Sequence, residues 1–243
     1  MLKILLLLLS GAKLGKLLTT GGTMLLSLVL YAFVYGWRYA VGFVGLLFVH
    51  EWGHYLAARQ RGLAVGPMTF IPFMGAWIEL KDMPHDAETE AFVGLGGPLL
   101  GSIGALLVYW MARSWDLAWL LAVSYSGFFL NLFNLIPLSP LDGGRITAVL
   151  SPRIWLLGVP MLGALFLWRP SPMLLIIALF AAPQVWKAIR YRSDSDEAKT
   201  YYAVATAKKW EYGLIYIVLA AFLALMTYEV HELLQALPPV RAG

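Results

Sequence analysis

The chain has 243 residues, of which 60% are hydrophobic and 13% are Asp, Glu, Lys or Arg, about half the charged share of an average soluble domain. This composition predicts an integral membrane protein without room for a large soluble domain beside its apolar segments. The net charge of +4 is spread over short connections, a distribution that reports on membrane topology and argues against a nucleic-acid partner. Because the sequence has no cysteine, disulfides and thiolate metal sites are excluded, and any metal must be held by His, Asp or Glu.

The first third of the chain contains two predicted spanning helices. The apolar run 2–9 is too short to cross a bilayer and is expected to be an interfacial segment or a re-entrant turn. Gly21-Gly22 is expected to be a break, after which the first spanning helix covers about 23–35. The second covers about 40–59 and ends in Arg59-Gln60-Arg61-Gly62, a basic last turn followed by a glycine stop.

The second predicted helix carries His50-Glu51-Trp52-Gly53-His54, a His-Glu-x-x-His motif. Helical residues four apart stand one turn above each other, so His50 and His54 can offer nitrogens to one metal ion. Glu51 lies on the neighbouring face, where it can reach a water molecule at the metal. The alternative is a pair of buried histidines bonded to backbone carbonyls. The apolar surroundings favour the metal site, because polar groups are costly to place in lipid.

Residues 63–82 interrupt the helical pattern. Gly66-Pro67 and Ile71-Pro72 disfavour a helix, whereas Met68 to Ile71 and Ala76 to Leu80 are rich in strand-forming residues. We expect a β-hairpin or small sheet that dips beside the helices, where non-helical backbone is tolerated only against protein or a wet cavity. The alternative is an amphipathic loop lying on the surface.

The third and fourth helices are expected over about 89–112 and 117–135. The third carries Gly94, Gly97, Gly101 and Gly104 at a spacing that lets another helix approach closely. Gly96-Gly97-Pro98 adds an expected local break. The fourth helix ends in a segment with two prolines and two glycines, Asn134 to Arg145, which predicts unwound backbone.

The last hundred residues predict a short helix over 145–151, apolar segments over 154–168 and 171–186, a polar stretch over 187–212 and a final helix over 213–230. We therefore expect an all-α polytopic membrane protein with six or seven transmembrane helices and a small membrane-associated β-hairpin or sheet. The chain, 1–243, is expected to form a single membrane-embedded domain, with a core over about 23–151 and C-terminal helices over about 154–235.

The positive residues predict the orientation. If the N-terminus is cytoplasmic and each segment crosses once, fourteen of the eighteen Lys and Arg residues lie inside. The four outside are Arg38, Arg113, Arg169 and Arg241. The same topology places His54 and Asp142 toward the cytoplasmic half of what we expect to be a prokaryotic cell membrane.

A third metal ligand has several candidates. His85 and His231 are expected to be solvated surface residues, whereas Glu79, Glu88 and Glu90 are possible by position. Asp142 is better placed, because it follows an unwound helix end and precedes two glycines that let the backbone bend back. The alternative for Asp142-Gly143-Gly144 is a plain turn.

The two motifs together resemble the site-2 protease family of intramembrane metalloproteases, peptidase family M50. The resemblance covers about 40–150 and rests on His50 to His54 and on Asn134-x-x-Pro137-x-x-Pro140-Leu141-Asp142-Gly143-Gly144, with Gly96-Gly97-Pro98 similar to a family element. It implies Zn2+ bound by His50, His54 and Asp142, with Glu51 as general base and then acid, and Asn134 holding the substrate carbonyl or oxyanion. It also implies a substrate-binding strand within Phe70 to Leu80, with contacts at Phe70, Gly75, Ala76, Trp77 and Ile78. The PDZ or CBS domain of many members has no room here.

The expected function is that of an intramembrane zinc endopeptidase that cuts a membrane-protein substrate in or near a transmembrane segment. Its expected partners are that substrate and the bilayer, with no nucleic acid and an open oligomeric state. The alternative is an inactive or non-hydrolytic metal-binding membrane protein that binds transmembrane helices. A carrier would be expected to show repeated broken helices, and only 134–145 has that character. Another His-Glu-x-x-His protease would use a glutamate as third ligand.

Overall fold

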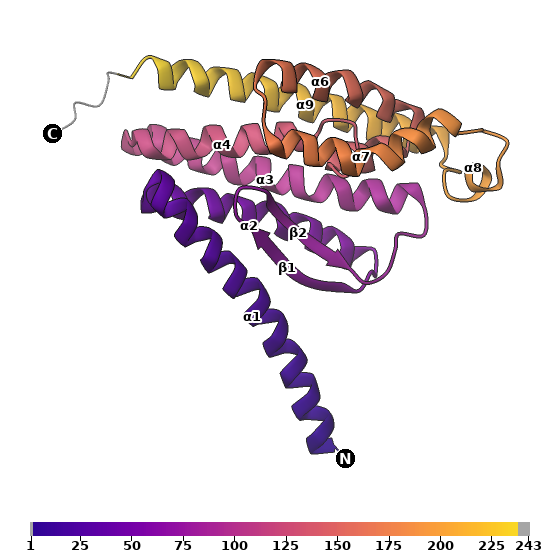
Figure 1. Ribbon diagram of the computed structural model, residues 1–243, viewed down its shortest axis with the longest axis horizontal. Helices are drawn as coiled ribbons and strands as arrows, with labels where there is room; N and C mark the ends of the chain where they lie inside the picture. Colours follow the sequence, from indigo (N-terminus) through magenta and orange to yellow (C-terminus); the bar gives the residue numbers. More distant parts are fainter. Residues whose placement is uncertain (1, 238–243) are drawn as a thin grey trace.

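The computed structural model describes residues 2–237 as a mostly helical protein with one small sheet (Figure 1). Met1 and residues 238–243 lie outside the described part, and Arg241, expected on the outer side, is among them. The elements in chain order are α1 (Leu2–Tyr35), α2 (Trp37–Gln60), β1 (Val65–Ile71), β2 (Gly75–Leu80), α3 (Ala87–Trp115), α4 (Ala118–Asn134), α5 (Asp142–Ala148), the 3-10 helix η1 (Pro152–Leu157), α6 (Gly158–Trp168), α7 (Pro172–Arg190), α8 (Asp196–Thr200) and α9 (Thr206–Gln235).

α1 is one continuous helix whose N-terminal half extends away from the other elements (Figure 1). The predicted break at Gly21-Gly22 and the separate segment over 2–9 are therefore wrong. A glycine inside a helix costs only about 1 kcal/mol relative to alanine, which is less than an unbonded backbone group costs in an apolar medium. The hydroxyl of Thr23 donates to the carbonyl of Thr19 in the same stretch, at 2.7 Å.

The centre of the fold is a layer in which α3 packs against α2 on one side and α4 on the other. The backbones of α2 and α3 approach so closely at Gly53 and Gly96 that a Cβ atom on either glycine would overlap the other residue's carbonyl. Small residues therefore permit the approach, as the glycine spacing predicts. The break predicted at Gly96-Gly97-Pro98 is wrong, because α3 continues through Pro98.

The predicted hairpin is confirmed as a two-stranded antiparallel sheet in which Met68 pairs with Ile78 and Phe70 with Ala76. α1 covers the outer edge of β1, where hydroxyls of the helix accept hydrogen bonds from backbone N–H groups of the strand. Met68 N donates to Thr20 Oγ1 at 3.1 Å and Phe70 N to Thr23 Oγ1 at 3.2 Å. Within the described residues, the outer edge of β2 pairs with no third strand.

Between α4 and α5 the chain unwinds over 135–141, as its prolines predict, and α5 begins at Asp142. α9 begins at Thr206, earlier than the expected residue 213, and it packs along α4. α6 and α7 form the adjoining hairpin (Figure 1).

Four helical segments of the described chain are long and apolar enough to cross a membrane: Leu18–Tyr35, Ala87–Trp115, Pro172–Arg190 and Thr206–Gln235. α2 carries the polar motif, and α4 has 17 residues. These helices support an integral membrane protein, while the count of six or seven crossings stays a prediction.

Candidate metal centre

Two histidines of α2 and the first residue of α5 converge in the interior. His50 Nε2 lies 3.2 Å from Asp142 Oδ2, and His54 Nε2 lies 3.2 Å from Asp142 Oδ1. The two Nε2 atoms are 3.2 Å apart. All three side chains are buried, with 3 to 7% of each residue exposed. Among the described residues, these three form the group with metal-ligand geometry.

The other ring nitrogens are occupied by acceptors that fix the orientation of both imidazoles. His50 Nδ1 donates to Asn131 Oδ1 at 2.9 Å, because the amide nitrogen of Asn131 already donates to Gly127 O at 2.7 Å. His54 Nδ1 donates to the carbonyl of Val93 at 2.8 Å. With the protons on Nδ1, both Nε2 lone pairs point into the shared space, which is the usual arrangement for metal-binding histidines.

This donor set fits a zinc ion. A tetrahedral zinc with nitrogen and oxygen ligands at about 2.0 to 2.1 Å holds the ligand atoms about 3.3 Å apart, close to the spacing found here. Two neutral imidazole lone pairs facing each other at this distance need a shared cation. Asp142 Oδ2 is buried without a hydrogen bond among the described residues, an expensive state unless an ion binds it. Three ligands leave a fourth position for a reactant, as in catalytic zinc sites.

Two glycines allow the chain to bring Asp142 to the histidines. A Cβ atom on Gly143 would overlap the carbonyl groups of Leu135 and Ile136, and one on Gly144 would overlap the backbone at Ser139. Side chains from later elements fix the same segment. Trp155 Nε1 donates to Gly144 O at 2.7 Å, and Tyr216 OH donates to Leu135 O at 2.5 Å. The glycines thus have a packing role that a surface turn would not require.

Glu51 lies beside the ligands on α2 and is 5% exposed. Within the described part of the chain it makes no hydrogen bond and no ion pair. An unpaired buried carboxylate next to a metal centre is available for proton transfer.

The other third-ligand candidates lie elsewhere. Glu88 faces Arg61 at 3.6 Å, and Glu90 accepts from Tyr201 at 2.6 Å. Glu79, His85 and His231 are exposed side chains. The structure brings only Asp142, among the candidates considered, to the two histidines.

Glu90 belongs instead to a contact between α3 and the segment before α9. Tyr201 donates to Glu90, and its carbonyl accepts from Ala87 N at 2.9 Å. Burial, and then the nearby charge of Glu90, raise the pKa of the Tyr201 phenol. The phenol therefore stays protonated and continues to donate to Glu90 across the neutral pH range.

Asn134 is half-buried, and its Nδ2 donates to Leu130 O at 3.1 Å within α4. Asn131, one turn earlier, was missed by sequence reasoning although it contacts His50. The available signal was a polar residue on the same apolar helix, three positions before Asn134. Its partner becomes visible only when α4 packs against α2.

The predicted strand residues occupy different positions on the hairpin. Phe70 is 1% exposed and packs with Leu47 and Met68, so its side chain is inside the protein. Trp77 is half-exposed, while Ala76 and Ile78 are partly buried. Gly75 begins β2 with φ of 115°, a conformation that favours glycine.

Comparisons with known proteins place these residues in context. Residues 38–116 match the family model of peptidase family M50. The chain is 32% identical over 125 residues to a zinc metalloprotease of Methanocaldococcus jannaschii, an alignment covering 47% of this chain and 36% of that protein. The chain thus spans about a third of that relative's length. A solved site-2 protease from Methanocaldococcus jannaschii aligns with a TM-score of 0.45 and 20% identity, over 75% of this chain and 87% of that one.

Proposed function

We infer that the chain is a zinc metalloprotease of the site-2 protease family, and we propose that it hydrolyses a peptide bond in or near a transmembrane segment of a membrane protein. The matched residues 38–116 contain the first motif. The observation that carries the proposal is the convergence of His50, His54 and Asp142 beside a buried, unpaired Glu51.

The residues divide the chemistry among them. His50, His54 and Asp142 would hold Zn2+, which when bound polarises a carbonyl and lowers the pKa of a water molecule to about 7. Glu51 takes a proton from the attacking water and returns it to the amide nitrogen as the C–N bond breaks. Asn134 is proposed to steady the substrate carbonyl oxygen as negative charge develops on it.

β2 is proposed to hold the substrate in extended form. A helical peptide has no free backbone groups, so it must unwind before attack, and an unpaired strand edge can bind the unwound chain. In an antiparallel ladder, residues opposite each other point their backbone groups the same way, both inward or both outward. Met68 and Phe70 direct their N–H groups outward to α1. Their partners Ile78 and Ala76 therefore direct theirs to the open edge of β2, where Gly75 and Trp77 complete the proposed contact set. Phe70 is proposed to support this edge from inside the protein, because its side chain is buried and its N–H is bonded to Thr23.

The proposed topology has six or seven crossings in a single membrane-embedded domain. α2 and α4 would cross beside α3, with which they pack. The positive residues favour an active site toward the cytoplasmic side. Selection of substrates is proposed to depend on the membrane-embedded part, which contains the matched residues 38–116.

The second candidate is an inactive or non-hydrolytic metal-binding protein that binds transmembrane helices. Such a protein needs the metal centre but has no use for an unpaired buried carboxylate beside it. The retained Glu51 therefore favours hydrolysis.

Metal analysis paired with cleavage of model transmembrane substrates by purified protein tests the proposal. Glu51→Gln is expected to retain zinc and lose cleavage, whereas Asp142→Ala is expected to lose zinc and Glu79→Ala to retain it. Unchanged turnover in Glu51→Gln would exclude Glu51 as the base. Full zinc content in Asp142→Ala would exclude Asp142 as a ligand.

A further inference from the structure

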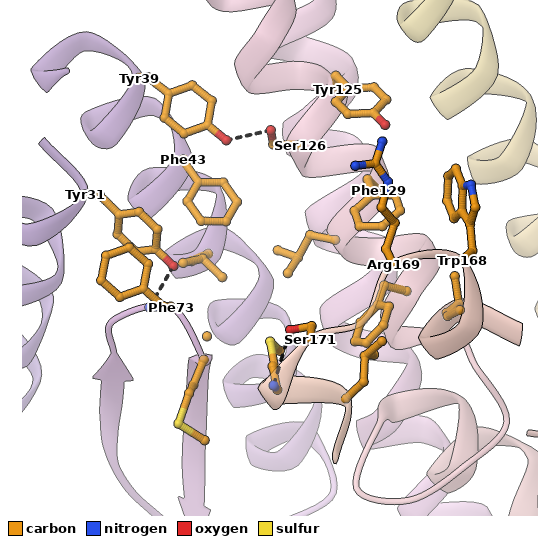
Figure 2. A pocket seen from close by; sticks show the side chains of 18 residues that line it. Tyr31, Tyr39, Phe43, Phe73, Tyr125, Ser126, Phe129, Trp168, Arg169 and Ser171 are labelled. Carbon is orange, nitrogen blue, oxygen red and sulfur yellow. Dashed lines mark hydrogen bonds between the residues drawn. The ribbon is translucent and has the colours of Figure 1, made fainter. Parts of the chain in front are cut away.

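A mostly apolar cavity of about 390 Å³ lies between α1, α2, α4, the hairpin turn and the α6–α7 connection (Figure 2). Aromatic side chains supply much of its wall. They include Tyr31 and Phe43 on one side and Phe129 and Phe133 on the other. The hydroxyls of Tyr39 and Ser126 are hydrogen-bonded to each other at 2.7 Å, so they offer little hydrogen bonding to a ligand.

One end of this cavity approaches the metal centre. Leu47 lies one turn before His50 on α2, and Leu130 and Phe133 directly precede Asn131 and Asn134 on α4. Gly75, the first residue of β2, also lines the cavity. A chain that leaves the open edge of β2 and the metal ligands can therefore continue into this space.

The other end carries Arg169, the one charged residue among those that line the cavity. Arg169 makes no ion pair or side-chain hydrogen bond with the described residues, and its guanidinium lies 5.6 Å from the centre of the Trp168 ring. Figure 2 shows its side chain turned toward Tyr125 and Phe129 of α4. The cavity therefore ends at an unpaired cation on an exposed residue.

Tyr125, which lines the same cavity, gives the level of Arg169 along α4. Tyr125 is seven residues into that helix, which is about 10 Å along its axis. Arg169 therefore lies alongside α4, on the exposed connection between α6 and α7.

Resting on the proposed function, we propose that Arg169 determines specificity by binding a carboxylate on the substrate segment that occupies this cavity. Charge complementarity identifies the group, since a guanidinium pairs with a carboxylate through two parallel hydrogen bonds. Because Gly75 of β2 lines the cavity, the occupant we propose is the substrate held at that strand.

The same geometry fixes where the carboxylate lies. Tyr125 and Asn134 are nine residues apart on α4, which is about 13 Å along the axis. This length corresponds to about nine helical or about four extended residues of substrate on the outer side of the cut. The carboxylate can belong to an Asp or Glu side chain or to the end of the segment itself.

Cleavage kinetics in zwitterionic phosphatidylcholine vesicles test the proposal. The substrates are model transmembrane segments that carry Glu, Gln or Lys within the window of four to nine residues from the cut. Two shortened segments end in that window, one with a free carboxylate and one amidated. Wild type is expected to show about tenfold lower KM for Glu than for Gln, and Arg169→Glu is expected to prefer Lys. Arg113→Gln, an exposed arginine at the end of α3 outside the cavity, is expected to keep the wild-type preference.

The outcomes separate this proposal from the proposed function. A preference for the free over the amidated end, without a preference for Glu over Gln, assigns the carboxylate to the terminus. Cleavage with equal KM for all substrates overturns the role of Arg169 while leaving the protease in place. If anionic phosphatidylglycerol changes the KM of wild type but not that of Arg169→Gln, and neither protein prefers one substrate, Arg169 contacts a lipid and the proposal is overturned. If wild type and Glu51→Gln cleave the same substrates, or neither cleaves any, the proposed function itself fails.

Discussion

His50 donates its Nδ1 proton to the side-chain oxygen of Asn131, at 2.9 Å, across the contact between α2 and α4. The amide of Asn131 is held in turn by its second hydrogen bond, to Gly127 O. Gly101 on α3 leaves room for it, since a Cβ atom there would overlap the Asn131 side chain. Three helices thus cooperate to present Nε2 of His50 to the metal position.

Replacing Asn131 should therefore weaken zinc binding. Asn131→Ala leaves the Nδ1 proton of His50 without its acceptor, and we expect zinc affinity to fall about 10- to 100-fold. Competition with a zinc chelator measures the affinity without relying on activity. Asn134→Ala is the matched control on the same helix, because among the described residues its amide bonds only to Leu130 O in α4, and it should retain zinc while turnover falls. Equal zinc affinity in wild type and Asn131→Ala would contradict this role.

Removing the metal should lower the stability of the fold. The ligands come from α2 and α5, which approach each other only in the folded chain, so zinc binds the native state in preference to the unfolded one. We expect a chelator to lower the unfolding temperature of wild type and Glu51→Gln alike. Asp142→Ala should show little further change, and an equal shift in that variant would mean that the chelator acts elsewhere.

The sequence predicted those features that depend on local patterns. The helical spacing of His50 and His54, the unwound segment before Asp142 and the hairpin around Gly75 all follow from short-range preferences. The Gly21-Gly22 break was mispredicted because glycine weakens a helix only modestly, and a long apolar helix absorbs that cost. The same reasoning failed at Pro98, where α3 continues.

The features that were missed depend on packing between distant segments. Nothing near Asn131 in the sequence shows that it faces His50, which is 81 positions away. The coverage of β1 by Thr20 and Thr23 likewise follows from the length of α1. These contacts decide which nitrogen is free to bind a metal and which strand edge is open, so neither could be predicted from the sequence.

A methyl group at Gly97 should disrupt the centre. A Cβ atom there would overlap the imidazole of His54 at Nε2, the atom that faces Asp142. We expect Gly97→Ala to reduce zinc content severely and to destabilise the α2–α3 contact. Gly45→Ala is the control within α2, because no atom lies within 4 Å of its added Cβ. That change should leave zinc content intact, as measured by metal analysis of the purified variants.

Proline substitutions in β2 should distinguish substrate binding from folding. Ile78 directs its N–H to the open edge, so Ile78→Pro removes a donor that the hairpin does not use. Trp77, opposite Thr69, directs its N–H into the ladder, and Trp77→Pro should disrupt the hairpin itself. We expect Ile78→Pro to raise KM at least severalfold with normal zinc content and thermal stability, whereas Trp77→Pro should lower stability as well. Ile78→Ala controls for the lost side chain, and if it raises KM as much as Ile78→Pro does, the backbone of β2 does not bind the substrate.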